Sequence, residues 1–236
     1  MLPHIIEEIQ RPDSDLIKAF SEQSSATVHE AMGKRGAVHS SIKPLYSGMR
    51  LCGPALTLRG HAADNLMLLK ALDMAQHGDI IVADMGQMTE AGPWGEITTF
   101  QGKVRGVGGL ITNGSVRDSL AIKELDFPVF CKSVCIKGTG KDALGYINHS
   151  ISIGDTPVNP GDIILGDEDG VVVIPLQEAE EILQKSIARE EKEAEQKKRI
   201  QQGESFFHFM GYDQVLKEKG CRIAKTAANT KEENVR

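Results

Sequence analysis

Short apolar runs alternate with helical segments through the first two thirds of the chain, and this alternation constrains the fold more than any other feature. The strand-like runs are "RLCGPALTLRG", "DIIVAD", "GLITN" and "FPVFCKS", and the helical segments between them are "NLMLLKALDMAQH", "GEITTFQGKVRG" and "RDSLAIKEL". Strand and helix alternating at this spacing is typical of βαβ crossovers, in which helices cover a parallel sheet. The sequence therefore predicts an α/β fold class.

Capping residues indicate where several helices begin and end. The stretch from Leu16 to Gly36 predicts two short helices, with Ser24 or Ser25 as the cap of the second and Gly33 as its stop. Asp64 is placed to cap the helix that follows the first long strand. These signals predict short, well-delimited helices in the first part of the chain.

The later part of the chain has a different pattern. In "DTPVNPGDIILGDEDGVVVIP", Pro-Gly and Asp-Gly turn signals separate β-rich runs, so we expect antiparallel strands or a hairpin added to the same body. A strong helix former follows over about residues 176–202, and Gly203 is placed to end it. The expected organisation is one α/β domain over residues 1–220, including this helix, and a polar, disordered tail over 221–236.

Composition and charge exclude several classes of protein. With 236 residues, 40% of them apolar, the chain can bury a sizeable core. Its formal charge of −6 argues against nucleic acid as a partner, because phosphates demand a basic face. No segment has 18 uninterrupted apolar residues and the start of the chain does not resemble a signal peptide, so we expect a cytoplasmic protein with no membrane partner. Four cysteines without a CxxC pair are interpreted as reduced thiols.

The segment "AGPWGEITTF" is a candidate anion site. Pro93 and Gly95 form a tight loop ahead of a helix, and the backbone N–H groups of Glu96, Ile97 and Thr98 would be the free donors of its first turn. Such a terminus favours a carboxylate. The alternative is that the loop only shapes a turn and that Glu96 favours the helix dipole.

Arg117 and Asp118, in "GGLITNGSVRD", are the second candidate. They follow a strand and open a helix, the position at which ligand crevices form in open α/β sheets. A guanidinium binds carboxylate oxygens through two parallel hydrogen bonds, and a carboxylate is a hard ligand suited to Mg²⁺ or Mn²⁺. The alternatives are that Asp118 caps the helix and that Arg117 forms a surface ion pair.

Taken in order, several segments of the chain resemble one family. It is the family that contains the 4-hydroxy-4-methyl-2-oxoglutarate and 4-carboxy-4-hydroxy-2-oxoadipate aldolases and the ribonuclease E activity regulator A proteins. The likeness covers about residues 20–215, and the segments that carry it are "ATVHEAMGKRG", "GPWGE", "RGVGGLITNGSVRD", "FPVFCKS", "GTGKD" and "NPGDIILGDEDGVVVIP". The resemblance implies a swivelling β/β/α type of α/β domain with a long C-terminal helix, assembled as a homotrimer or a dimer of trimers with sites between subunits.

The resemblance also implies roles for particular residues. In the aldolases, the loop matched by residues 95–98 holds the carboxylate of pyruvate, Arg117 matches an arginine that contacts the substrate, and Lys141 matches a lysine near the site. Asp118 matches the direct ligand of a Mg²⁺ or Mn²⁺ ion. Glu96, and Glu193 from a neighbouring subunit, match acidic residues that hold the water shell of the metal.

These matches favour a metal-dependent lyase. It would cleave 4-hydroxy-2-oxo dicarboxylic acids, release pyruvate and also decarboxylate oxaloacetate, so the expected ligand is a small oxo-acid. The long C-terminal helix favours the aldolases over the regulator proteins, which lack it. The aldolase pattern usually has an acidic residue at the position of Ala121. This departure concerns the natural aldol substrate more than the pyruvate and metal chemistry. The alternatives are a non-catalytic binding protein like the ribonuclease regulators and a sugar-acid lyase or dehydratase.

Overall fold

The structure is a computed structural model that describes residues 4–86 and 88–224. It divides into two compact units, Met1–Arg189 and Glu190–Arg236. The expected domain over residues 1–220 stays a prediction. Of the expected tail over 221–236, residues 225–236 lie outside the described part of the chain.

An eight-stranded sheet organises the first unit. Four neighbouring strands, β2, β3, β4 and β6, run parallel, whereas β1, β8, β11 and β12 pair antiparallel with their neighbours. The strands along the sheet are β1 (Lys43–Pro44), β6 (Val129–Cys131), β4 (Gly109–Thr112), β3 (Ile80–Asp84), β2 (Leu51–Arg59), β11 (Ile163–Asp167) and β12 (Gly170–Ile174), with β8 (Tyr146–Ile147) also on β2. The predicted parallel sheet with antiparallel strands added from the later part of the chain is confirmed.

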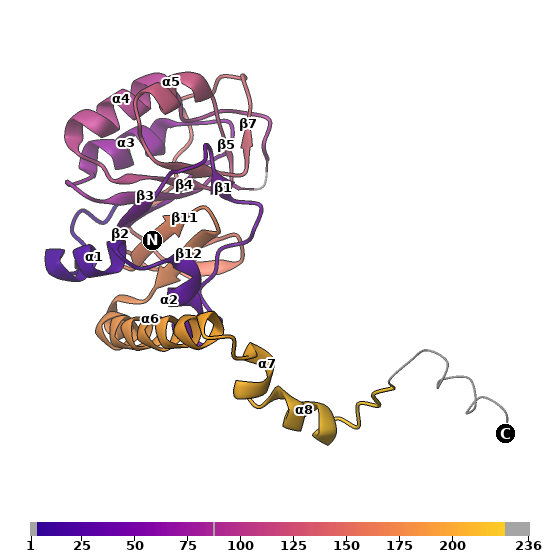
Figure 1. The fold of residues 1–236 in the computed structure, drawn as a ribbon. Helices are drawn as coiled ribbons and strands as arrows, with labels where there is room; N and C mark the ends of the chain where they lie inside the picture. Colours follow the sequence, from indigo (N-terminus) through magenta and orange to yellow (C-terminus); the bar gives the residue numbers. More distant parts are fainter. Residues whose placement is uncertain (1–3, 87, 225–236) are drawn as a thin grey trace. The chain divides into compact units, whose positions relative to one another are not determined.

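Three crossover helices cover one face of the parallel strands (Figure 1). They are α3 (Leu66–Met74), α4 (Glu96–Arg105) and α5 (Ser119–Glu124), and each connects two neighbouring parallel strands. Trp94, fully buried beneath α4, stacks on Phe127 and donates from its indole N–H to Thr99 Oγ1 at 2.7 Å. This packing fixes the start of α4, which carries part of the candidate site.

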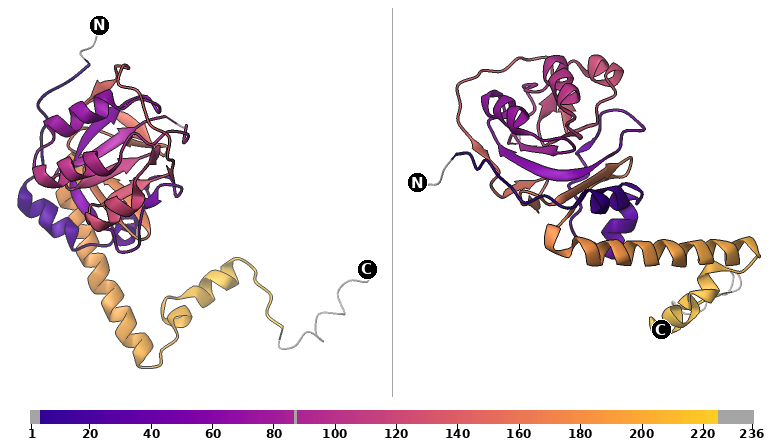
Figure 2. Two further views of the ribbon diagram at one scale, coloured as in Figure 1. Left: turned by 90° about the horizontal axis from the view of Figure 1, so that it is seen from above. Right: turned by 90° about the vertical axis from the view of Figure 1, so that its left-hand side faces the viewer.

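The other face of the sheet curls around a second core, so that the sheet is nearly closed into a barrel (Figure 2). Side chains such as Val82, Ile111 and Phe130 point inward there, and the hairpin of β9 (Ile151–Ile153) and β10 (Thr156–Val158) adds to the same core. The Lys43 ammonium, at one edge strand, donates to the Asp169 carbonyl beside the other edge at 2.7 Å. The inward faces of the strands therefore fill an apolar interior.

A third layer packs against β11 and β12. It consists of α1 (Ser14–Ser21), α2 (Ser25–Ala31) and the first turns of α6 (Ala179–Gln201), with Phe20 and Ile182 buried beneath them. Ser24 is the cap of α2, because its hydroxyl accepts the Thr27 N–H at 3.0 Å. The two short helices and the cap agree with the prediction from the sequence.

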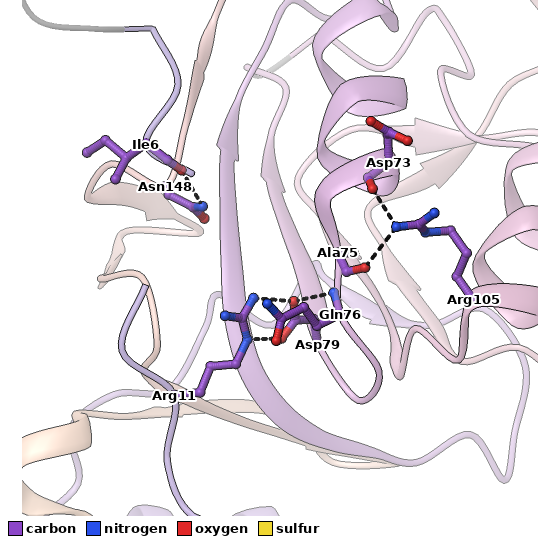
Figure 3. Close-up of polar contacts among 8 residues, drawn as sticks. All are labelled: Ile6, Arg11, Asp73, Ala75, Gln76, Asp79, Arg105 and Asn148. Atoms are coloured by element: carbon purple, nitrogen blue, oxygen red, sulfur yellow. Dashed lines mark hydrogen bonds and ion pairs between the residues drawn. The ribbon is translucent and has the colours of Figure 1, made fainter. Parts of the chain in front are cut away.

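The loop that follows α3 differs from expectation. The sequence predicted a helix continuing to Gly78, whereas α3 ends at Met74. The fully buried Asp79 carboxylate accepts the Gln76 N–H at 2.8 Å and pairs with Nε and Nη2 of Arg11 (Figure 3). Arg105 donates to carbonyls at the end of the helix (Figure 3). These contacts supply hydrogen bonds to backbone N–H and carbonyl groups that a longer helix would have paired internally.

The remaining elements are short, apart from the C-terminal helix. A small parallel sheet joins β5 (Ser115–Val116) and β7 (Ser133–Val134). A 3₁₀ turn, η1 (Leu176–Glu178), precedes α6, which confirms the long helix expected over about 176–202. The second unit continues from α6 into α7 (Phe206–Phe209) and α8 (Tyr212–Glu218). Within the described part of the chain, no helix is both long and apolar enough to cross a membrane.

Candidate functional site

The predicted site residues of the first unit line a single cavity of about 300 Å³. It lies where the start of α4 meets the connection between β5 and α5. The predicted residues that line it are Gly95, Glu96, Ile97, Thr98, Arg117, Asp118 and Lys141, and the further lining residues are Asn65, Leu69, Gly92 and Pro93. Segments from four separate parts of the sequence therefore meet at one cavity.

Backbone pairing places the two main segments side by side. Trp94 forms an isolated bridge with Val116, and the Arg117 N–H donates to the Trp94 carbonyl at 2.8 Å. On the other side, the Gly92 N–H donates to the Lys137 carbonyl at 2.9 Å. The loop before α4 is thus held against β5, which delivers Arg117 and Asp118.

Gly95 has no room for a side chain. A Cβ at this position would collide with Asp118 Oδ2 and would lie 3.0 Å from Arg117 Cγ. Its N–H donates to Thr98 Oγ1 at 2.9 Å, which fixes the first turn of α4. Glycine at this position therefore lets the Asp118 carboxylate approach the backbone at the start of the helix.

Asp118 does not cap α5 with its side chain, although it is the residue before that helix. Its backbone is left-handed, with φ 54° and ψ 39°, and the carboxylate makes no capping hydrogen bond. Instead Oδ2 accepts the Glu96 N–H of α4 at 3.1 Å. The alternative that the Asp118 side chain caps α5 is therefore wrong. A non-glycine residue in this strained conformation is typical of functional sites.

Arg117 lies against the same carboxylate. Its Nε is 3.5 Å from Asp118 Oδ2, and both side chains are close to half exposed. Within the described residues its terminal guanidinium nitrogens make no hydrogen bond, so they can bind an anion in the cavity. Arg117 thus forms an ion pair, as one alternative expected, but its partner is the Asp118 carboxylate of the same site. The pair orients the guanidinium.

The amides at the start of α4 are only partly free. The Glu96 N–H is taken by Asp118, whereas we find no hydrogen bond of the Ile97 and Thr98 amides to any described residue. Open amides and the helix dipole together favour a carboxylate. Two of the three donors expected from the sequence are therefore available.

The loop that carries Lys141 is tied to the residues before α3. The buried Asp64 carboxylate accepts the Leu66 N–H at 2.9 Å and the Asp142 N–H at 2.6 Å. Burial alone would raise the pKa of Asp64, but these amides and that of Ala143 lower it below its usual value. The carboxylate thus fixes Lys141 at the edge of the cavity, a role that differs from the simple cap expected from the sequence.

Asn65 is a site residue that sequence reasoning missed. Its Nδ2 donates to the Pro93 carbonyl at 3.1 Å, and its Oδ1 is buried without a hydrogen-bond partner among the described residues. A buried acceptor of this kind is costly unless a ligand or water satisfies it. The only sequence signal was its place beside Asp64, which indicated a helix start rather than a site.

The chemistry of the donor set fits a hard divalent cation. Asp118 and Glu96 bring two carboxylates to the cavity, and Mg²⁺ typically uses one or two carboxylates with waters and substrate oxygens. No group of three or more His, Cys, Asp or Glu side chains that could hold a metal occurs in the described residues. Glu193 lies on the part of α6 that belongs to the second unit, so its expected role stays a prediction.

The fold and the cavity define an α/β protein with a crevice at a strand-to-helix junction. The chain belongs to the RraA-like family, described as Aldolase/RraA, which it matches over residues 25–173.

Comparisons with individual proteins agree with this assignment. The chain is 37% identical to a Halalkalibacterium halodurans protein named "Putative 4-hydroxy-4-methyl-2-oxoglutarate aldolase", over 75% of this chain and 85% of that protein. It is similar to the crystal structure of Streptomyces coelicolor RraAS2, titled an unusual member of the RNase ES inhibitor RraA protein family. The TM-score is 0.69 at 27% identity, covering 79% of this chain and 98% of that one. A Pseudomonas syringae structure shares the fold, with TM-score 0.75 at 23% identity, over 84% of this chain and 93% of that one.

Proposed function

We propose that this protein is a divalent-metal-dependent lyase that cleaves 4-hydroxy-2-oxo dicarboxylic acids and releases pyruvate. The observation that carries the proposal is the junction of Arg117, Asp118 and the open start of α4 around one cavity. The name of the Halalkalibacterium halodurans relative supports it. The chemical difficulty of such a cleavage is the enolate of pyruvate, so the site must stabilise developing negative charge.

The substrate's carboxylate would bind at the start of α4. The amides of Ile97 and Thr98 donate to it, and the Arg117 guanidinium donates to the adjacent 2-oxo oxygen. The amide oxygen of Asn65 accepts a hydrogen bond from a substrate hydroxyl or water, which satisfies its buried acceptor.

Charge and proton transfer are assigned to the remaining groups. Mg²⁺ or Mn²⁺, held directly by Asp118 and through water by Glu96, would supply Lewis-acid stabilisation of the oxyanion when bound. Arg117 adds a fixed positive charge beside the same oxygen. Glu96 orients a water that takes the 4-hydroxyl proton as the C3–C4 bond breaks, and a water later reprotonates the enolate. Lys141 adds positive charge at the edge of the cavity.

Oxaloacetate would be decarboxylated at the same site. Loss of carbon dioxide from its C4 leaves the same pyruvate enolate, which the same groups stabilise. A side activity on oxaloacetate follows from the proposal, and it provides a convenient assay.

The active form is proposed to be a homotrimer or a dimer of trimers. An apolar surface that includes Ile97, Phe100 and Val104 lies along one face of α4, and each of these side chains is more than half exposed. A second cavity beside the site is edged by Leu120, Val134 and Ile136, and it shares Glu96, Arg117 and Asp118 with the first. A second copy of the chain that covers this surface would also close the site, and Glu193 of that copy is the residue we expect there.

The second candidate is a non-catalytic binding protein. The likeness to a structure titled as a member of an RNase ES inhibitor family favours it. In that case the protein would act through surface contacts, and no turnover would be seen with any oxo-acid. A sugar-acid lyase or dehydratase remains the third candidate, with the same residues acting on another hydroxy acid.

A panel assay tests the proposal. Pyruvate release, coupled to lactate dehydrogenase, is measured for oxaloacetate and for several 4-hydroxy-2-oxo acids, with Mg²⁺, with Mn²⁺ and with a chelator. We expect metal-dependent release from at least one hydroxy-oxo acid and from oxaloacetate. Absence of pyruvate from every compound, together with capture of purified ribonuclease E, would support the second candidate instead.

A further inference from the structure

Another cavity, of about 490 Å³, opens at the mouth of the barrel, apart from the two beside Arg117 and Asp118. Four neighbouring parallel strands each deliver one polar residue to it at their carboxyl ends. Arg59 ends β2, Asp84 ends β3, Asn113 directly follows β4 and Lys132 directly follows β6. Crevices at the carboxyl ends of parallel strands are where open α/β sheets bind ligands. No residue lines both this cavity and the one at Arg117 and Asp118.

The opposite wall comes from the segment before β1 and from the β9–β10 hairpin. Gly154 and Asp155 form its tight turn, with φ 52° and 65°, and the His39 N–H donates to the Gly154 carbonyl at 3.1 Å. A Cβ on Gly154 would lie 2.8 Å from the His39 nitrogen. The hairpin is therefore held against His39, and Asp155 is fixed at the rim.

Hydrogen bonds hold the strand-end residues in place. Asp84 Oδ1 accepts from Asn113 Nδ2 at 2.7 Å and from the Gly86 N–H at 3.1 Å. Asn113 Oδ1 in turn accepts the Met85 N–H at 2.8 Å. These hydrogen bonds preform the floor of the cavity, as is usual in binding sites.

The cationic groups of the cavity are less fully satisfied. The Lys132 ammonium makes no hydrogen bond or ion pair with any described residue, and Arg59 Nε reaches Asp84 Oδ2 only at 3.7 Å. His39 Nδ1 accepts the Ser41 N–H at 3.1 Å, so the neutral ring carries its proton on Nε2 and has a donor to spare. Asp155 and the Ser152 hydroxyl supply acceptors on the facing wall.

We infer that this cavity binds a small organic acid that carries hydroxyl groups. The carboxylate would pair with Lys132 and Arg59, and the hydroxyls would donate to Asp155 and accept from Ser152 or His39. A ligand with charge alone would leave Asp155 facing an apolar chain. A ligand with hydroxyls alone would leave the Lys132 ammonium without a partner and Arg59 with only its long contact to Asp84. The proposal does not depend on the lyase activity, since no residue of that site takes part.

Three probes of similar size separate the two kinds of contact. D-Gluconate has a carboxylate and hydroxyls, hexanoate has only the carboxylate and sorbitol has only hydroxyls. Isothermal titration calorimetry on the full chain should show saturable binding of gluconate. Each of the other probes should bind at least about tenfold more weakly, since hexanoate loses the hydrogen bond to the Asp155 carboxylate and sorbitol loses the pairing with the Lys132 ammonium. Absence of saturable gluconate binding, or equal affinity for all three probes, would overturn the inference.

Variants then locate the binding. Lys132→Gln should weaken gluconate binding about tenfold. Asp155→Asn, which keeps a residue tolerant of the left-handed turn, should reduce the preference for gluconate over hexanoate. Arg117→Met is the control for the other cavity and should leave gluconate affinity unchanged. If Arg117→Met abolishes binding while Lys132→Gln does not, gluconate occupies the other cavity and the inference is wrong.

Discussion

Asp118 holds a strained backbone conformation and turns its carboxylate away from the helix that it precedes. The carboxylate accepts from the start of α4 instead, beside Arg117. A left-handed non-glycine residue costs roughly 1–2 kcal/mol. Strain of this kind persists where the surrounding structure imposes it, and it commonly marks residues kept for function rather than for stability.

Two substitutions of Asp118 separate its backbone from its side chain. Both Asp118→Gly and Asp118→Ala remove the hydrogen bond to Glu96, but only glycine adopts φ 54° without strain. We expect the glycine variant to be more stable than the alanine variant by about 1 kcal/mol in urea unfolding, with both inactive. Equal unfolding free energies would mean that this backbone position relaxes at no cost.

Gly95→Ala tests the close approach of the carboxylate to α4. The added methyl group would collide with Asp118 Oδ2, so the carboxylate has to move. We expect kcat/KM for oxaloacetate to fall by about 100-fold, because small displacements at a reacting centre have effects of that size. Gly138→Ala is the matched control, since a Cβ there would make only a van der Waals contact, with Arg117 Nη1 at 3.4 Å. Comparable losses in both variants would remove the steric explanation.

At the scale of elements, Asp64 joins the start of α3 to the loop that carries Lys141. The Gly140 N–H donates to the Ala63 carbonyl at 2.8 Å, and the Asn65 N–H donates to the Gly140 carbonyl at 3.1 Å. With the two side-chain bonds of Asp64, these contacts clamp the loop against the helix. The position of Lys141 thus depends on a residue that does not line the cavity.

Asp64→Asn should release this loop. A carboxylate has two acceptor oxygens, one for the Leu66 N–H and one for the Asp142 N–H, whereas an asparagine side chain has only one. One of the two hydrogen bonds is therefore lost. We expect faster hydrogen exchange at the Asp142 amide and a kcat/KM about tenfold lower. Asp73→Asn, on the exposed side of the same helix, is the control and should change neither.

Acid should have the same effect on the loop in the wild-type chain. The pKa of Asp64 lies below its usual value because backbone amides outweigh burial. Such a carboxylate contributes stability above its unfolded pKa, about 3.9, and loses it as pH falls through the lower folded pKa. Exchange at Asp142, corrected for intrinsic rates, should therefore rise only below about pH 4. A rise near neutral pH would assign the change to another group.

Local sequence patterns were enough to predict the helices and strands, but not the tertiary contacts that end α3 and surround Asn65. The period of apolar residues predicted the crossover helices, and Ser24 was one of two caps considered for α2. By contrast, α3 ends before Gly78 because Asp79 and Arg105 bind the backbone there. Arg105, and the Arg11 that holds Asp79, come from distant segments. The orphaned oxygen of Asn65 likewise depends on the Pro93 carbonyl, which only the folded chain brings near.

At the scale of the whole molecule, the layered cores make two thiols unreactive. Burial raises the pKa of Cys52 to about 12 and that of Cys131 to about 11. Both thiols therefore remain protonated at pH 8, whereas Cys221 is exposed. We expect Ellman's reagent to modify Cys221 rapidly in the native protein and Cys52 and Cys131 only after unfolding, as read by mass spectrometry of peptides. Rapid native labelling of Cys131 would contradict the described packing of β6.

The exposed face of α4 predicts self-association. Phe100→Asp places a charge in the middle of the apolar surface that includes Ile97 and Val104. We expect a homotrimer or larger assembly for the wild type, and a monomer with strongly reduced activity for the variant, by light scattering after gel filtration. Lys18→Asp, at an exposed position on α1, is the charge-changing control. An unchanged mass for Phe100→Asp would place the subunit contact elsewhere.

The fold class could be predicted because the alternation of strands and helices is a local feature of the sequence. Closure of the sheet depends on contacts between distant residues. The edge strands β1 and β12 approach through contacts such as Lys43 to Asp169, across more than half of the chain. The cavity at Arg59 and Lys132 had no signal either, since its residues are single polar positions after four separate strands. Such constellations are visible only when strand order is known.

The most direct test of the proposed site is a crystal structure of the protein soaked with Mn²⁺ and pyruvate, read from the anomalous signal of manganese. We expect the ion on the Asp118 carboxylate, the pyruvate carboxylate at the amides of Ile97 and Thr98, and the Arg117 guanidinium on the 2-oxo oxygen. Manganese and pyruvate both bound away from these residues would contradict the account.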